Sequence, residues 1–339
     1  MSEFKVNTIT NRDGSHGPQV CGITTFGSSG MQLPSGPTEF RGGRGRGVFN
    51  GGRNNPNYYS NLSVVEIATT GDATDFGDMS KALNGGSGNV SSSTRGIISG
   101  GYEGSPGANV RHIDYFIFSS SGGSNTFGEL TEDSNDQGAC SNGRRGIFGM
   151  GYPSYSGNIT YITIAHTGNA LEFGQMIQTG YPTAGAINSP TRGVFSAIET
   201  PSSSQNLLTE FITFDTLGNS QEFGDLSVAR NACSACSSST RGLTQGGLTP
   251  SVSDVIDFCT IATLGNFTDF GNLTVGRRSP AGCSSETRGL CAAGTTPTNQ
   301  NVIDFVTIST TGNSTDFGDL SYAARNVRGN SDVHGGLAQ

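Results

Sequence analysis

Short runs of apolar, β-branched and aromatic residues recur along the chain, separated by clusters of Gly, Ser, Thr, Asn and Pro. No stretch has the apolar spacing of an amphipathic helix, whereas short apolar runs bounded by turn-forming residues are typical of β-strands. The clearest example lies at 231–273, where "NACSACSS", "RGLTQGG" and "VIDFCTIAT" precede a run from Phe267 to Leu273. This segment predicts four consecutive strands, joined by a short "ST" turn, a variable loop and a tight "LGN" turn.

The four-strand unit occurs six times along the chain. An Arg-Gly marker recurs every 47 to 50 residues, and a Phe-Gly marker recurs independently every 46 to 51 residues. The first marker falls at Arg46, Arg95, Arg145, Arg192, Arg241 and Arg288, and the second at Phe76, Phe127, Phe173, Phe223, Phe270 and Phe317. Repeated four-stranded units of about 40–50 residues are the signature of a β-propeller. The sequence therefore predicts an all-β fold, a six-bladed β-propeller over residues 46–339.

The ends of the repeat array predict how the propeller closes. The first unit begins with its second strand at Arg46, so its first strand is missing. After the last Phe-Gly marker the chain continues with "NVRGNSDVHGGLAQ", which reads as a surplus first strand. We expect this C-terminal strand to close the first blade, which leaves no unpaired sheet edge to aggregate.

Residues 1–45 precede the repeats and are predicted to form a separate, extended or hairpin attachment arm. The segment alternates apolar and polar positions around an Asp-Gly turn, a common hairpin signal. Its apolar residues are Phe4, Val6, Ile9, Val20 and Ile23. They would pair with the sheet edge of a partner protein or companion subunit, or fold back as an intramolecular hairpin that caps the propeller.

The repeats resemble the kelch class of propellers. The likeness lies in the paired glycines that end the second strand (51–52, 100–101 and 246–247), in an aromatic residue on the third strand, and in the Phe of the fourth. The third-strand aromatics are Tyr115, Tyr161, Phe211, Phe258 and Phe305. Kelch repeats carry Trp where this chain has Phe, and three of the six units lack the clean double glycine, so the expected fold is kelch-like.

A second resemblance concerns the whole chain. The first 45 residues and phrases of the type "IDFxTIxTTGNxTDFGDLS", as at 303–321, resemble virion structural proteins, often labelled tail-fibre-like, of contractile-tailed phages of marine cyanobacteria. The resemblance implies a location in the virion and other virion proteins as partners.

Composition and charge narrow the classes of partner. The net charge of −8 argues against nucleic acid as the main partner, because phosphate contacts need a basic face. No run approaches the roughly 18–20 apolar residues that span a bilayer, so no membrane insertion is expected. The first ten residues lack an apolar signal core, which predicts assembly in the host cytoplasm.

The candidate chemical groups predict no enzyme, no cofactor and no metal site. Most of the seven cysteines fall at apolar strand positions of the repeat, where Cys acts as a small hydrophobe. The acids Asp72, Asp75 and Asp78 and their counterparts near Asn313 lie three residues apart, which does not match a calcium loop. The four histidines occupy non-equivalent places, and none belongs to a nucleophile–base motif. A propeller hydrolase acting on surface polysaccharide is therefore the least favoured of the three functions considered, below the two binding and structural functions given at the end of this subsection.

The recurrent arginines allow two interpretations. They would form an anion-binding collar, or each would pair with a repeated acid such as Asp225, Asp257, Asp304 or Asp319. Because the arginine occurs in every unit, we favour the structural role.

Connections between strands divide into an invariant set and a variable set. The first-to-second and third-to-fourth turns repeat "STRG" and "TTGN", whereas the second-to-third and fourth-to-first loops all differ. Binding residues characteristically lie on variable loops held by a rigid frame. The predicted recognition residues are the loop tyrosines, whose flat rings suit stacking on sugar or protein: Tyr58, Tyr59, Tyr102, Tyr152 and Tyr155.

These observations predict a phage tail fibre or accessory adhesin that binds a host-surface glycan or protein receptor non-covalently through its variable loops. The alternative is a structural decoration or connector of capsid, neck or tail, with the loops packed on neighbouring virion proteins. The sequence leaves a homo-oligomer open, since no heptad repeat or intertwined stalk fixes a subunit number.

Overall fold

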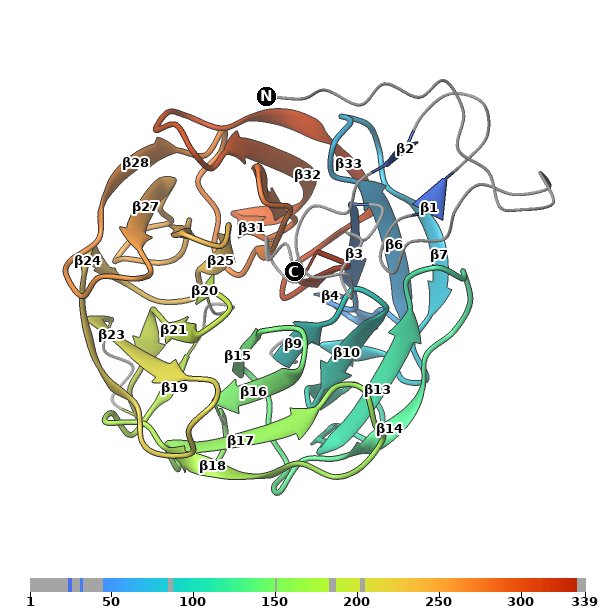
Figure 1. Cartoon of the computed structure of the whole chain (residues 1–339). Coiled ribbons are helices and arrows are strands. Elements are labelled where there is room, and N and C mark those ends of the chain that lie inside the picture. The colour runs from blue at the N-terminus through green and yellow to red at the C-terminus, as the bar shows by residue number, and fades with distance from the viewer. Residues whose placement is uncertain are drawn as a thin grey trace, which may run out of the picture. The chain divides into compact units, whose positions relative to one another are not determined.

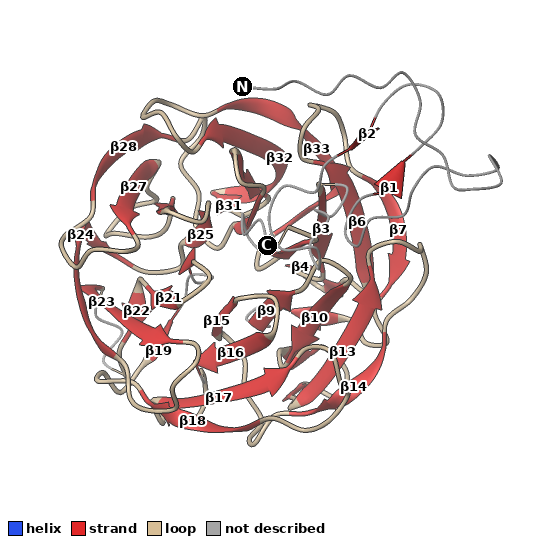
Figure 2. Cartoon of the chain, viewed as in Figure 1, coloured by secondary structure: helices blue, strands red, loops and turns tan. Residues whose placement is uncertain are grey.

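The computed structural model describes residues 45–84, 88–149, 151–182, 187–201 and 205–333, together with two short strands at 24–25 and 31–32. Every regular element among these residues is a β-strand, and Figure 2 shows strands and loops without a helix. The described part accordingly holds no helix able to cross a membrane. The expected all-β fold is confirmed.

The chain divides into two compact units, one over residues 1–42 with Gln339 and one over residues 43–338. In the first unit, β1 (Thr24–Thr25) pairs antiparallel with β2 (Met31–Gln32). The sequence did not predict this pairing. The expected Asp-Gly hairpin and the five apolar arm residues lie outside the described residues.

The second unit contains five four-stranded antiparallel sheets and one five-stranded sheet within its described residues. Each is named below after the arginine that begins its second strand, and its strands are given from the innermost to the outermost. The Arg46 sheet contains β34 (Arg328–Ser331), β3 (Arg46–Asn50), β6 (Asn61–Glu66) and β7 (Thr74–Asp78). The Arg95 sheet contains β9 (Gly88–Ser91), β10 (Arg95–Ser99), β13 (His112–Ile117) and β14 (Asn125–Glu129). The Arg145 sheet contains β15 (Gly138–Ser141), β16 (Arg145–Gly149), β17 (Asn158–Thr163) and β18 (Leu171–Gln175).

The other three sheets repeat the same order. The Arg192 sheet contains β20 (Ile187–Asn188), β21 (Arg192–Phe195), β23 (Asn206–Thr213) and β24 (Gln221–Arg230). The Arg241 sheet contains β25 (Ser234–Ser237), β26 (Arg241–Gln245), β27 (Val255–Thr260) and β28 (Thr268–Asn272). The Arg288 sheet contains β29 (Ala281–Ser284), β30 (Arg288–Ala292), β32 (Thr298–Thr307) and β33 (Thr315–Ala324), with β31 (Thr295–Thr296) as its fifth strand on β32.

Figure 1 shows these sheets side by side around a common centre, with the innermost strands next to it and the outer strands at the periphery. Neighbouring inner strands contact one another in the order β34, β9, β15, β20, β25 and β29, and β29 contacts β34 in turn. The second unit is therefore a β-propeller-like assembly of four-stranded antiparallel sheets.

The Arg46 sheet combines strands from opposite ends of this unit. Strand β34 pairs antiparallel with β3, from Gly47 opposite Ser331 to Asn50 opposite Arg328. Beyond the ladder, the Asp332 carboxylate accepts hydrogen bonds from the backbone N–H groups of Gly45 and Arg46, at 3.1 and 2.9 Å. The Arg46 sheet, which is the first along the chain, is thus completed by a strand almost 280 residues further on.

The Arg-Gly marker marks a close contact between neighbouring sheets. A Cβ placed at Gly289 would lie 2.5 Å from the Sγ of Cys236, and one at Gly47 would lie 2.8 Å from the Sγ of Cys283. In each case the sulfur comes from the inner strand of the preceding sheet. The glycine leaves the space that this side chain occupies.

The Phe-Gly marker likewise marks a close contact between neighbouring sheets, at the periphery. A Cβ at Gly271 would collide with the backbone of Gly312, which lies in the third-to-fourth turn of the next sheet. The Gly312 N–H donates a 2.8 Å hydrogen bond to the Phe270 carbonyl. Equivalent bonds join Gly71 to Phe317, Gly122 to Phe76, Gly168 to Phe127, Gly218 to Phe173 and Gly265 to Phe223.

The core consists of clusters that lie between sheets. Within five of the sheets the marker Phe meets the third-strand aromatic edge to face, with centroids 5.9–6.2 Å apart. In the Arg46 sheet the third strand carries Val64 instead, and Phe76 packs on Phe116 of the next sheet at 5.6 Å. These edge-to-face pairs are the favoured aromatic geometry.

We expect Gly289→Ala to lower the free energy of unfolding by about 1–3 kcal/mol, because the new methyl group overpacks the contact with Cys236. Chemical denaturation measures the change. Adding Cys236→Ala to this variant should recover part of the loss, since it removes the sulfur that the methyl group meets.

Gly168→Ala is the matched control, because a Cβ at that position meets no atom within 4 Å. Equal stability changes for the two glycine variants would contradict the close-contact role of Gly289.

Candidate functional site

The loop face is the side of the second unit on which the second-to-third and fourth-to-first connections lie. The opposite side, with the first-to-second and third-to-fourth connections, is called the turn face. Several of the loops form small sheets of their own. These are β4 (Arg53–Asn54) with β5 (Asn57–Tyr58), β8 (Leu83–Asn84) with β11 (Tyr102–Glu103) and β12 (Ala108–Asn109), and β19 (Tyr181–Pro182) with β22 (Ile198–Glu199). Several of the variable loops are therefore held on the frame by backbone pairing, within one loop or between two.

The structure does not bring the five loop tyrosines together. Tyr58 and Tyr102 form one pair with centroids 6.2 Å apart, and Tyr152 and Tyr155 form another at 5.8 Å. Tyr59 stacks on Tyr322 at 4.6 Å, so its ring is used in packing. Tyr152 is the most accessible of the set, with 44% of its surface exposed. Two separate aromatic spots remain as recognition candidates.

The repeated arginines act between sheets. Arg241 lies over the ring of Phe258, 4.6 Å from its centroid, and its Nη1 donates a 3.0 Å hydrogen bond to the Ile308 carbonyl of the next sheet. Four other marker arginines stack in the same way, with their guanidinium carbons 4.7–5.1 Å from the ring centroids: Arg95, Arg145, Arg192 and Arg288. Carbonyls of the following sheet accept from Arg46, Arg95, Arg145, Arg192 and Arg288.

The prediction that these arginines pair with repeated acids is wrong. Asp257 and Asp304 are fully buried and pair with Arg230 and Arg277 instead. The marker arginines instead donate hydrogen bonds to carbonyl oxygens at the strand ends of the next sheet. Five of them also stack on an aromatic ring of their own sheet. Arg46, which has no aromatic beneath it, is the exception and forms an ion pair with Glu66 at 3.3 Å.

A third buried acid has histidine as its partner. Asp114 lies 2.7 Å from the Nε2 of His112, an ion pair when the histidine is protonated, and accepts hydrogen bonds from the hydroxyls of Ser80 and Ser124. The hydrogen bond to Asp114 raises the pKa of His112, although burial and Lys81 oppose it. Burial alone would raise the pKa of Asp114, but the hydrogen bonds from His112, Ser124 and Ser80 outweigh it and hold that pKa below its usual value.

The cysteines in the described part are buried free thiols. Burial raises the pKa of each, to about 11 for Cys233 and about 12 for Cys259, so they stay protonated at neutral pH. The described residues hold no group of three or more His, Cys, Asp or Glu side chains that suits a metal ion. The suspected acids serve the frame instead: Asp72 accepts from the Asp319 N–H at 3.0 Å, and Asp78 accepts from Ser60 at 2.9 Å.

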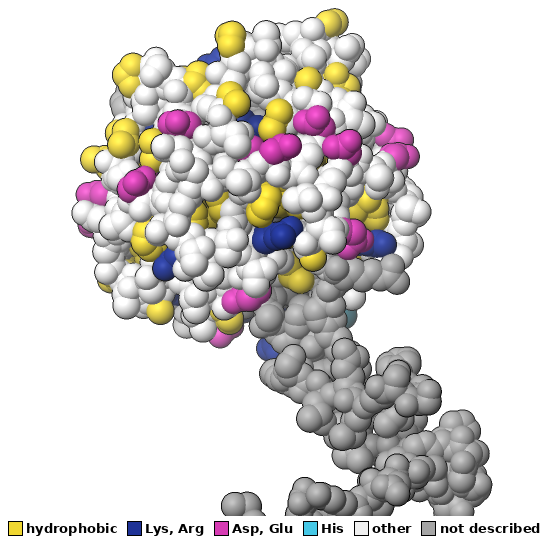
Figure 3. All heavy atoms as spheres, turned by 90° about the horizontal axis from the view of Figure 1, so that it is seen from above, with side chains coloured by type: hydrophobic (Ala, Val, Ile, Leu, Met, Phe, Trp, Pro, Cys, Tyr) yellow, Lys and Arg dark blue, Asp and Glu magenta, His cyan; other side chains and the backbone are white. Residues whose placement is uncertain are grey.

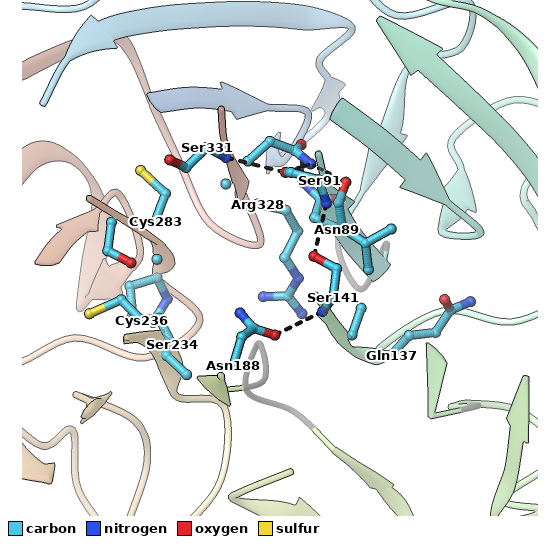
Figure 4. A pocket seen from close by; sticks show the side chains of 18 residues that line it. Asn89, Ser91, Gln137, Ser141, Asn188, Ser234, Cys236, Cys283, Arg328 and Ser331 are labelled. Carbon is cyan, nitrogen blue, oxygen red and sulfur yellow. Dashed lines mark hydrogen bonds between the residues drawn. The ribbon is translucent and has the colours of Figure 1, made fainter. Parts of the chain in front are cut away.

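A small cavity of about 60 Å³ lies among the inner strands. Hydrogen bonds link neighbouring inner strands here, from Ser331 to Ser91, Ser91 to Ser141, Ser141 to Asn188, Asn188 to Ser237 and Ser237 to Ser284. Figure 4 shows Arg328 extending from β34 into this cavity. The space admits a few water molecules, and nothing larger.

A larger pocket of about 270 Å³ opens on the loop face, and Arg328 is the residue that lines both it and the inner cavity. This mouth pocket is built only from second-to-third loops, fourth-to-first loops and the first residue of β34. Four arginines and two acids contribute its charge, and the other residues are polar or small apart from Leu248. The lining residues are Arg53, Asp136, Glu199, Asn231, Ala232, Leu248, Arg278, Ser279, Arg325, Asn326 and Arg328.

Sequence reasoning missed the mouth pocket, although the repeat register carried a signal. Arg278 and Arg325 occupy the position that Asn135 and Asn231 hold in other fourth-to-first loops. Arg328 occupies a position that is otherwise small, as at Gly138, Ser234 and Ala281. Recurring residues reveal the frame, whereas these arginines stand out only as departures from the repeat.

Figure 3 shows one side of the periphery, where most of the visible surface is neutral and the acidic and basic side chains are scattered.

No protein-family model matches this chain, and a search of curated proteins gives no significant match either. The candidate site therefore rests on the geometry described above.

We expect Arg241→Ala to lower the free energy of unfolding by about 2 kcal/mol, because the variant loses a charged hydrogen bond across sheets and the contact with Phe258. Denaturant titration provides the measurement. Arg111→Ala is the control, since this half-exposed arginine forms surface ion pairs with Glu129 and Asp133 and its loss should change stability by less than about 1 kcal/mol. An Arg241→Ala protein as stable as wild type would contradict the inter-sheet role.

The His112–Asp114 pair predicts a pH dependence of stability. Because the pKa of His112 is raised in the folded state, its contribution is fully present below the ordinary value of 6.5 and is lost as the pH rises through the raised pKa. The stability advantage of wild type over His112→Gln should therefore shrink between about pH 5.5 and pH 8.5. An NMR titration of the His112 ring that gave a pKa at or below 6.5 would refute this assignment.

Proposed function

We propose that the second unit is a six-bladed, kelch-like β-propeller in which β34 closes the first blade. The pairing of β34 with β3 supports this, as do the contacts that run from each sheet to the next. Arg288 donates to the Ile67 carbonyl at 3.2 Å and Gly71 donates to Phe317 at 2.8 Å, so the Arg288 and Arg46 sheets meet by the same bonds as the others.

We infer that this propeller belongs to a phage virion and acts as a tail fibre or accessory adhesin, assembled in the host cytoplasm. The observation that carries the proposal is the difference between the two faces. On the turn face, the repeated turns are committed to bonds with neighbouring sheets, as Asn266 and Asn313 accept from the Asp225 and Asn272 N–H groups. On the loop face, hairpins of different sequence leave aromatic spots and a charged pocket accessible.

The adhesin acts by binding and not by catalysis. The clearly shifted acid, histidine and thiol pKa values belong to buried groups of the frame or, for Asp136, to the lining of the mouth pocket. None of these described groups forms a nucleophile–base pair of the kind that hydrolysis requires. Individually weak contacts become strong when many copies on one particle engage a cell together.

Attachment to the particle uses the arm at residues 1–45 and the turn face. Leu217 and Leu264, at equivalent turn positions of the Arg192 and Arg241 sheets, expose 57% and 58% of their surface. Other turns carry Thr at this position, as at Thr70 and Thr311. Exposed leucines in adjacent sheets favour a contact with another virion protein on this side.

We expect the labelled full-length protein to bind susceptible host cells saturably and to be displaced by their isolated envelope polysaccharide. Tyr152→Ala should weaken binding by about threefold to tenfold, because it removes an exposed aromatic ring from the loop face. Flow cytometry over a concentration series measures both effects.

Leu264→Ala, on the turn face, is the matched control and should bind cells as wild type does. Folded protein that fails to bind susceptible cells contradicts the adhesin. In the assembled virion, a loop face buried against neighbouring proteins would favour the connector function instead.

A further inference from the structure

We propose that the mouth pocket binds the anionic group of a single acidic sugar, a carboxylate or a sulfate ester, with Arg53, Arg278, Arg325 and Arg328 as its recognition residues. This inference rests on the proposed host-surface function and names the class of receptor: an acidic polysaccharide of the host envelope.

The described residues neutralise the four guanidinium groups of the pocket only in part, since Asp136 interacts electrostatically with Arg328 and Arg53. Among the described residues, none of them forms an ion pair or a side-chain hydrogen bond. Arg328 is only 8% exposed, and its Nε, like that of Arg53, is buried without an acceptor. A buried cation without an acceptor is costly, so the arrangement favours an anion that supplies the missing oxygens.

The charges also lie close enough to influence one another. Arg53 and Arg325 are locked side by side by two backbone hydrogen bonds of 3.0 and 3.1 Å. Burial lowers the pKa of Arg325, and the neighbouring charges of Arg53 and Arg278 lower it further. Asp136 offsets part of this charge beside Arg328, and Glu199 accepts from Asn231 at 2.8 Å. The pocket keeps an excess of positive side chains on a protein whose net charge is −8.

The frame does not require these arginines. The Arg145 and Arg241 sheets form with Asn135 and Asn231 where Arg278 and Arg325 stand, and with Gly138 and Ser234 in place of Arg328. Residues that depart from the repeat without serving the fold are candidates for binding.

Size and geometry favour one sugar unit. The pocket of about 270 Å³ lies just below the roughly 300–1,000 Å³ of pockets that hold drug-sized ligands. Arginine forks bind carboxylate and sulfate oxygens with paired hydrogen bonds. Ser279, Asn231 and Asn326 offer neutral donors and acceptors for ring hydroxyls. A nucleic acid would need a row of basic contacts and not one enclosed pocket.

The test is isothermal titration of the full-length protein with glucuronic acid, glucose 6-sulfate, glucose and inorganic sulfate. We expect both acidic sugars to bind, with affinity that falls as salt rises, and glucose not to bind. The variant Arg278→Asn/Arg325→Asn copies the residues of other loops and should bind the acidic sugars at least about tenfold more weakly, since charged hydrogen bonds are lost.

Two controls separate binding from folding. Arg111→Gln removes a cation outside the pocket and should bind as wild type does. The melting temperature of the double variant without ligand should equal or exceed that of wild type, because a repulsive pair is removed. A double variant that melts lower and binds as tightly as wild type would overturn the proposal.

Failure of the inference and failure of the proposed function give different results. Cell binding that persists in the double variant overturns the acidic-sugar site and leaves the adhesin intact. Acidic-sugar binding without cell binding supports the site and contradicts the adhesin. Inorganic sulfate that binds as tightly as glucose 6-sulfate would overturn the assignment to a sugar.

Discussion

Close backbone approach between neighbouring sheets is the constraint on which this structure depends. Two glycines permit it in each unit, one beside the marker arginine and one beside the marker phenylalanine, except that Gly96 meets Phe116 of its own sheet. Once the sheets are that close, the arginine reaches the carbonyl of the next sheet while its guanidinium covers an aromatic ring of its own. The aromatic ring in turn packs edge to face on the marker phenylalanine. Arginine, aromatic ring and phenylalanine therefore form one stack, and the glycines set its spacing.

The sequence was sufficient to predict the frame of four-stranded sheets, because this frame is built from a periodic repeat. Its markers predicted the all-β fold, the four-stranded units and the apolar positions of the cysteines, and the described residues confirm these three points. Periodicity reveals which positions are equivalent. It does not reveal what each position touches, since the partner lies in another sheet. The marker arginines illustrate the limit: their recurrence was evident, yet acids were expected where carbonyl oxygens stand.

The variation among the loops marked one face of the second unit, but the sequence could not place individual recognition residues on it. The five tyrosines chosen there fall into separate places, and one of them is used in packing. The mouth pocket gathers Arg53 with Arg278 and Arg325 from positions more than 200 residues apart. Such a convergence depends on how the loops meet near the axis, which no local pattern encodes.

The pairing of β34 with β3 also has a consequence for biosynthesis. Strand β3 leaves the ribosome well before its inner neighbour, which is translated about 280 residues later. At translation rates of about 5–20 residues per second, roughly 15–60 seconds pass with that edge open. Sheets in the middle of the chain have all four strands within one stretch and are free to form during this interval. A nascent chain therefore carries an unsatisfied strand edge until β34 has been translated, and chaperones that shield such edges would raise the yield of folded protein.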